Sequence, residues 1–97
     1  MLCIVSYDLK GSDKDYQVLY DKIDSLGSSY RCSESTIFLH TEIDAGLVDA
    51  AIRSVVDEEA VFVVVDITGV DEEKYFGRVV SRSNDDGFWK WVKMHNN

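Results

Sequence analysis

Apolar residues follow two different periods along this chain, and the order in which the periods alternate limits the folds open to it. Residues 2–9 are rich in β-branched and aromatic side chains, a pattern typical of a strand. Apolar residues then recur at steps of three and four, which predicts a helix with one apolar stripe: Tyr16, Leu19, Tyr20, Ile23 and Leu26. Gly27 follows directly, and we expect it to end this helix as a C′ residue with positive φ.

The strand and helix periods return in a different order. Residues 29–32 and 36–40 are predicted as short strands joined by a tight connection at residues 33–35. Asp44 is the expected N-cap of a second helix. Its apolar positions have helical spacing: Leu47, Val48, Ala51, Ile52 and Val55. Residues 60–68 form the clearest strand of the chain, and Gly69 ends it.

The order strand, helix, strand, strand, helix, strand is that of the split βαβ fold. We therefore expect the α+β class and a ferredoxin-like βαββαβ core over residues 1–69. Its four-stranded antiparallel sheet has the first and third strands in the centre and both helices on one face. Residues 70–97 are expected to be a C-terminal extension with a strand or ordered loop at 75–81. A short aromatic helix begins near residues 84–86 and packs on the core or on a partner subunit.

Charge is divided unevenly along the 97 residues. The formal net charge is −8, made of −10 over residues 1–76 and +2 over residues 77–97. An apolar content of 45% excludes a disordered acidic tail, and the length suits one domain. Strong DNA coating is excluded as well, because binding to phosphates requires clustered Lys and Arg. Nucleic acid is therefore not an expected partner.

Two cysteines form no disulfide framework and no zinc spacing, so Cys3 and Cys32 are expected to be buried or half-buried thiols. The N-terminal residues lack the basic segment of a signal peptide. The longest apolar run, residues 60–65, is far too short to span a membrane. These features predict a soluble cytoplasmic protein with no membrane partner.

Asp8 closes the first predicted strand, so its carboxylate should project at the end of the sheet, near the start of the third strand. Two interpretations remain open at this point. Aspartate commonly begins a turn. It is also a ligand for Mg²⁺, which often uses only one or two carboxylates, and two copies of Asp8 would meet in a symmetric dimer. No cofactor is required, and Mg²⁺ or Mn²⁺ would bind at such a dimer interface.

Three further groups of residues each allow a structural and a functional interpretation. His40 and His95 are expected at the surface or half-buried, with His40 at the opposite end of the sheet from Asp8. The aromatic tail of Phe88, Trp89 and Trp91 favours packing on a sheet or partner over stacking with single-stranded nucleic acid. Acidic residues form either a solvated surface or a phosphate-mimicking surface for a protein partner: Asp44, Asp49, Asp57, Glu58, Glu59, Asp71, Glu72 and Glu73.

Several short motifs resemble a known family. They are the strand end Tyr7-Asp8-Leu9, the Ser33-Glu34-Ser35-Thr36-Ile37-Phe38 strand, the end of the last core strand at residues 64–69, and the Gly87-Phe88-Trp89-Lys90-Trp91 tail. They resemble the SinR-like proteins, which are related to the small CRISPR-adaptation subunit and to the virulence-associated protein D ribonucleases.

The resemblance implies a ferredoxin-like homodimer. It also implies a metal ligand at Asp8, supported by Tyr7, and a metal-dependent endoribonuclease or phosphodiesterase wherever activity is kept. The charge of −10 over residues 1–76 departs from the basic DNA-holding relatives. We therefore expect a dimeric assembly or interaction module with a weak or vestigial metal-dependent nuclease site at Asp8. The alternative is an acidic inhibitor of a host defence or nucleic-acid-binding protein, acting through Asp57, Glu58 and Glu59.

Overall fold

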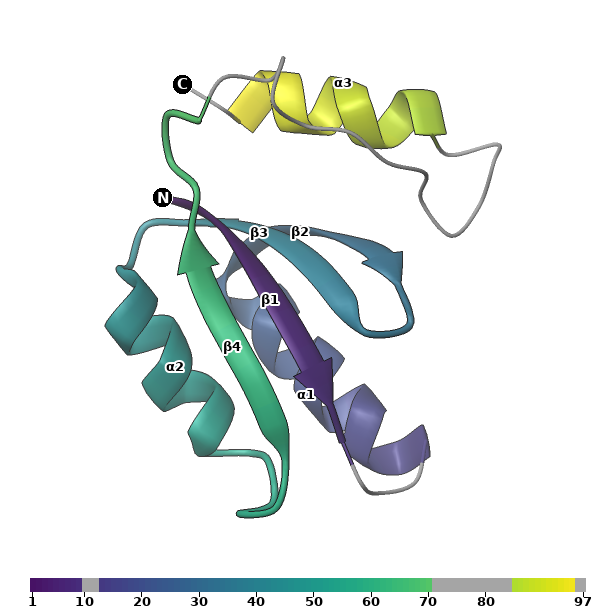
Figure 1. Ribbon diagram of the computed structural model, residues 1–97, viewed down its shortest axis with the longest axis vertical. Coiled ribbons are helices and arrows are strands. Elements are labelled where there is room, and N and C mark those ends of the chain that lie inside the picture. The colour runs from purple at the N-terminus through teal and green to yellow at the C-terminus, as the bar shows by residue number, and fades with distance from the viewer. Residues whose placement is uncertain (10–12, 71–84, 96–97) are drawn as a thin grey trace.

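The computed structural model describes residues 1–9, 13–70 and 85–95 (Figure 1). Its elements follow the predicted order, with a helix after the last strand. They are β1 (Leu2–Asp8), α1 (Asp13–Leu26), β2 (Gly27–Ser33), β3 (Thr36–Thr41), α2 (Ala45–Arg53), β4 (Val61–Asp66) and α3 (Asp85–His95). The predicted strand or loop at residues 75–81 lies outside the described residues. None of the described helices is long and apolar enough to cross a membrane.

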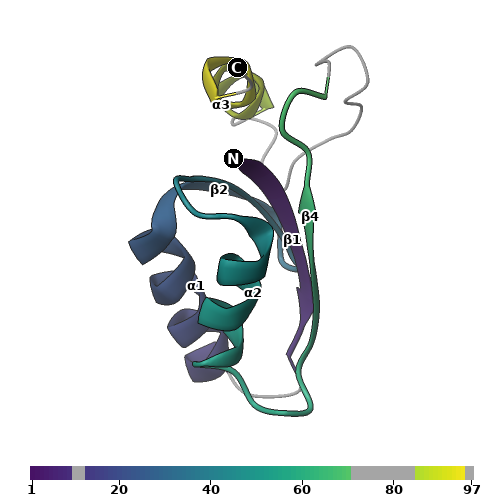
Figure 2. The same ribbon diagram turned by 90° about the vertical axis from the view of Figure 1, so that its left-hand side faces the viewer.

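The four strands form one antiparallel sheet in the order β2-β3-β1-β4. The first and third strands are therefore central, as predicted, and β2 and β4 are the edges. Helices α1 and α2 lie together on one side of the sheet (Figure 2). This side is called the inner face below, and the opposite side is called the outer face.

The main core lies between the inner face and the two helices. Alternate residues of the central strands point into it, because successive side chains of a strand point to opposite faces. The helices close it with residues from their predicted apolar stripes. Its buried members include Cys3, Val5, Ile37, Leu39, Leu19, Ile23, Val48 and Ile52. Leu47 departs from the prediction: it lies beside the buried stripe of α2 and is exposed.

The predicted role of Gly27 is wrong. Gly27 directly follows α1, but its φ is not positive: among the described residues, Gly69 is the one with a positive φ. Gly27 opens β2 instead, and a Cβ atom there would overlap the carbonyl oxygen of His40. The carbonyl of Leu26 at the end of α1 accepts a 2.7 Å hydrogen bond from the Thr41 hydroxyl. Thus a strand residue, rather than a glycine cap, completes the helix.

The other local signals are confirmed. Residues 34–35 connect β2 and β3 tightly, one residue fewer than the predicted 33–35. Asp44 caps α2, because its side chain accepts a 2.9 Å hydrogen bond from the Leu47 amide. The last core strand covers residues 61–66, shorter than the predicted 60–68.

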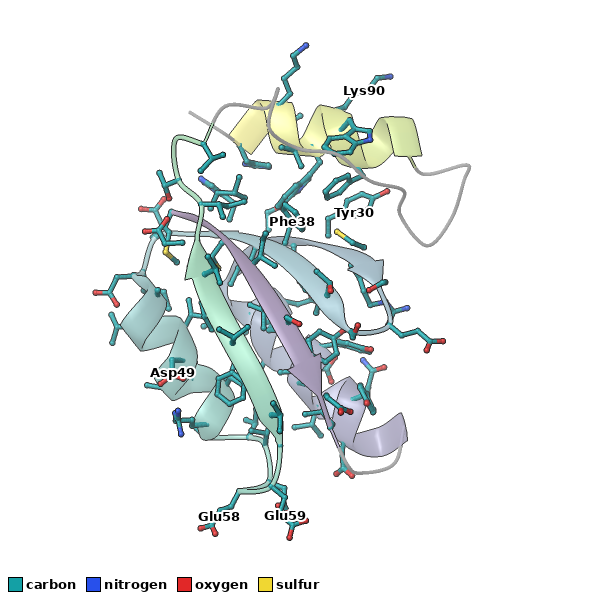
Figure 3. All side chains as sticks on the ribbon, in the orientation of Figure 1. Tyr30, Phe38, Asp49, Glu58, Glu59 and Lys90 are labelled. Atoms are coloured by element: carbon teal, nitrogen blue, oxygen red, sulfur yellow. The ribbon has the colours of Figure 1, made fainter. Side chains whose placement is uncertain are left out.

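Helix α3 forms a second, separate core on the outer face. Phe88 and Val92 are buried there against side chains of β2 and β3. Tyr30 and Phe38 point toward this helix in Figure 3. The C-terminal helix therefore packs on its own sheet, which is one of the two placements that the sequence left open.

Strand β4 presents a row of valines on the outer face. Val61, Val63 and Val65 pair with Asp8, Ser6 and Ile4, whose side chains share that face. Their exposed fractions are 61%, 53% and 46%. The outer face is thus covered by α3 over β2 and β3, while the valine row of β4 stays open.

Candidate functional site

Asp8 is the last residue of β1, and its side chain is exposed on the outer face. The register places it opposite Val61 of β4. On the other side of β1, the Tyr7 amide donates a 2.9 Å hydrogen bond to the carbonyl of Ser35, which holds the β2–β3 turn beside the strand end. Asp8 therefore lies at the end of the sheet near the start of β3, as predicted.

A shallow hollow of about 550 Å³ surrounds this strand end. It contains two carboxylates, Asp8 and Glu34, together with hydroxyl groups and two members of the valine row, Val61 and Val63. The lining residues are Ser6, Tyr7, Asp8, Tyr16, Glu34, Ser35, Val61, Phe62 and Val63. Sequence reasoning missed Glu34 as a site residue because its position depends on how the β2–β3 turn meets β1. The motif containing Glu34 was the available signal.

Tyr7 and Asp8 point to opposite faces, as adjacent strand residues must. Tyr7 is buried, and its hydroxyl donates a 3.3 Å hydrogen bond to the Tyr20 hydroxyl. Burial, and then this hydrogen bond, raise the pKa of Tyr7 above its ordinary value. Tyr7 therefore stays protonated at neutral pH, on the core side of β1.

Tyr16 holds the chain just beyond Asp8. Its hydroxyl donates a 3.0 Å hydrogen bond to the Leu9 carbonyl and accepts one of 3.3 Å from the Leu9 amide. The rings of Tyr7, Tyr16 and Tyr20 pack together with centroids between 6.0 and 6.3 Å apart. These contacts hold the backbone in place on both sides of Asp8.

A second hollow of about 450 Å³ adjoins the first and shares Tyr16 and Glu34 with it. Gln17, Tyr20 and Arg31 complete its lining. The Arg31 guanidinium lies 4.6 Å from the centre of the Tyr20 ring, a cation–π contact. Arg31 is thus the basic group among the described residues that line the two hollows.

The carboxylates of this hollow bear on whether the described residues could hold a metal ion. Within residues 1–9, 13–70 and 85–95, no group of three or more His, Cys, Asp or Glu side chains is placed to hold a metal ion. Asp8 and Glu34 supply oxygen ligands of the kind that Mg²⁺ and Mn²⁺ prefer.

The two histidines lie away from Asp8, as expected, because His40 pairs with Leu2 at the other end of β1. The sequence did not indicate that they meet. The His40 and His95 rings lie 4.6 Å apart between centroids and are tilted by 30°. This pair belongs to the contact between α3 and the sheet.

The aromatic residues of α3 contribute to packing. Phe88 contacts Phe38 edge to face at a centroid distance of 4.9 Å, and it also contacts Trp89. The Trp91 indole donates a 2.9 Å hydrogen bond to the Ser28 hydroxyl. Trp89 and Trp91 are half-buried in this arrangement.

The acidic residues Asp57, Glu58 and Glu59 form the exposed loop between α2 and β4. Glu58 and Glu59 project from the end of the molecule opposite α3 (Figure 3). The Asp57 carboxylate accepts a 2.8 Å hydrogen bond from the Glu59 amide, so it also shapes the loop. The exposure of these three residues agrees with the solvated surface that the sequence indicated as one of two interpretations.

Comparison with protein-family models and with curated proteins finds no match to this chain.

Proposed function

We propose that this chain is a homodimeric assembly module with a ferredoxin-like core of the SinR-like group. In this proposal its Asp8 hollow is a weak metal-dependent phosphodiesterase site completed by the second copy. The order of the elements and the central position of β1 and β3 support the fold assignment. The Tyr7-Asp8-Leu9 strand end supports the family assignment.

One observation carries the functional part: Asp8 and the valine row belong to the same surface. Val61 and Val63 line the hollow that contains Asp8 and Glu34. Contact between apolar surfaces is favourable by roughly 25 cal/mol for each Å² removed from water. A two-fold contact through the valine row therefore brings two such hollows toward each other.

The charge distribution favours a metal ion in that contact. Two copies would place four carboxylates, Asp8 and Glu34 from each, around a region bordered by apolar side chains. Carboxylates crowded in this way repel one another, and a divalent cation relieves the repulsion. A cation held there could polarise a phosphodiester and activate a water molecule.

The first experiment measures the oligomeric state of the full chain by light scattering across a concentration series. We expect twice the 11.0 kDa mass of one chain for the wild type and a monomer for Val63→Lys. Leu47→Lys is the matched control, because Leu47 is similarly exposed but lies on α2. A monomeric wild type at every concentration, or a dimer that survives Val63→Lys, would contradict the proposal.

The second experiment measures RNA cleavage in Mg²⁺ or Mn²⁺. Asp8→Asn should abolish cleavage while the dimer persists, and Asp66→Asn, at the far end of β4, should have no effect. Cleavage of equal rate by Asp8→Asn would remove the metal site from the proposal. A wild type that is dimeric but cleaves no RNA would contradict the phosphodiesterase part of the proposal and support only the assembly role.

A further inference from the structure

Two different kinds of contact hold α3 on the outer face. One is the apolar contact of Phe88 and Val92 with Tyr30 and Phe38. The other lies toward the end of the helix, where His95 packs against both His40 of β3 and Trp91 of α3. The centroid distances of these two ring contacts are 4.6 and 4.8 Å.

We propose that the His40–His95 pair is a pH-sensitive latch that releases α3 from the outer face of β2 and β3 in mildly acidic solution. Two neutral imidazoles pack favourably at this separation. Two imidazolium ions in the same place repel each other and lose hydration. Phe88 and Val92 are the buried residues of the apolar contact, and the histidine pair adds a second point of attachment at the end of the helix.

The charged groups around His40 mostly oppose its protonation. Burial lowers the pKa of His40, and His95 and the Met1 ammonium just before β1 lower this pKa further. The Glu42 carboxylate, just after β3, acts in the opposite direction. On α3, Lys93 adds positive charge in the same last turn as His95. Ser28 of β2, which pairs with His40, carries no charge.

The direction of the pH effect follows from this lowered pKa. When α3 leaves, the pKa of His40 rises toward its ordinary value of 6.5, so the released form binds the proton more readily. The docked form is therefore favoured fully above pH 6.5 and loses favour as the pH falls through that value. For one proton, the docking equilibrium falls by up to about tenfold per pH unit until the docked form also becomes protonated.

Release would change the surface that the protein offers to partners. The apolar sides of Phe88 and Val92, and the Tyr30 and Phe38 side chains beneath them, would become exposed. These strand residues lie on the same face as the valine row of β4. An open outer face would then extend across the whole sheet, which is a surface suited to contact with another protein.

Intrinsic fluorescence tests the latch directly, because Trp89 and Trp91 are the two tryptophans of the chain and both lie on α3. Between pH 8 and pH 5 we expect a red shift of the emission maximum and a several-fold rise in acrylamide quenching. Far-UV circular dichroism should retain the signal of the sheet. Emission intensity alone is unsuitable, since quenching of Trp91 by the ring packed beside it would change the intensity without any movement of α3.

His40→Phe removes the titrating group, and His95→Phe removes the imidazole that faces it; both variants keep an aromatic ring in place. Each should hold the emission maximum constant between pH 8 and pH 5. Ser28→Ala is the control: it removes the hydrogen bond from Trp91 and should weaken docking at every pH without changing its pH dependence. A wild-type emission maximum that does not move, or an equal shift in both histidine variants, would overturn the proposal.

Titration of the histidine C2 protons by NMR decides the case in which neither phenylalanine variant docks at pH 8. The pKa of His40 should lie below 6.5 in the wild type and return toward that value in Phe88→Ala, whose α3 has lost its main apolar contact. Equal values in the two proteins would show that docking and protonation are not linked. That result would also overturn the proposal.

Discussion

At the scale of single residues, Gly27 shows how a close backbone approach restricts the choice of side chain. We expect Gly27→Ala to destabilise the protein by about 1–3 kcal/mol, the usual cost of forcing extra volume into a packed site. The reason is that a Cβ would overlap the backbone oxygen of His40, which has little freedom to move. Urea unfolding would measure the loss.

Gly46→Ala is the matched control for that prediction. Gly46 lies in α2, where an added Cβ meets the Asp44 carboxylate at 3.4 Å. Alanine has a higher helix propensity than glycine by about 1 kcal/mol, so this variant should be neutral or more stable. Equal destabilisation by both substitutions would contradict the role assigned to Gly27.

Residue-scale prediction from sequence succeeded where the cause was local. Asp44 was identified as a cap because its hydrogen bond reaches an amide in the first turn of its own helix. Asp8 was placed at the strand end by the pattern of β1 alone. Glu34 beside Asp8, and His95 beside His40, depend on pairings between distant segments, which periodicity does not encode. The predicted positive φ of Gly27 is wrong for the same reason. Glycine is required there because the backbone of His40 in β3 approaches closely.

At the scale of elements, α3 should detach without unfolding the rest of the molecule. Its buried residues form a cluster separate from the core under α1 and α2. Phe88→Ala removes the central ring of that cluster, a change that costs about 3–5 kcal/mol in a typical core. We expect red-shifted tryptophan emission at pH 8 while the urea midpoint of the sheet, followed by circular dichroism, changes little.

Met94→Ala provides the comparison on the same helix. Met94 is 70% exposed, so its truncation should leave the emission maximum where it is in the wild type. If Phe88→Ala shifts the tryptophan emission and also lowers the urea midpoint of the sheet, the two clusters unfold as one unit.

At the scale of the whole molecule, the order of the elements was enough to predict an α+β protein with a four-stranded antiparallel sheet. The spacing of apolar residues indicated each helix or strand of the core, and the short connections limited how these elements could be arranged. The charge division seen in the sequence also has a spatial counterpart. The acidic loop and the aromatic helix lie at opposite ends of the molecule (Figure 3).

The antiparallel register of β4 also determines which of its amides water can reach. Ile67 donates a hydrogen bond to the carbonyl of Leu2, and in an antiparallel ladder such bonds recur at every second residue. The amides of Val63 and Val65 are therefore directed at β1, and those of Phe62 and Val64 point away from it along the sheet edge.

Amide hydrogen exchange in D₂O should consequently alternate along this strand, slow at Val63 and Val65 and fast at Phe62 and Val64. Uniform rates along the strand would contradict the register. The same measurement distinguishes two kinds of dimer. Contact through the valine side chains leaves the alternation in place, whereas pairing of two β4 edges would slow the outward amides to match their neighbours.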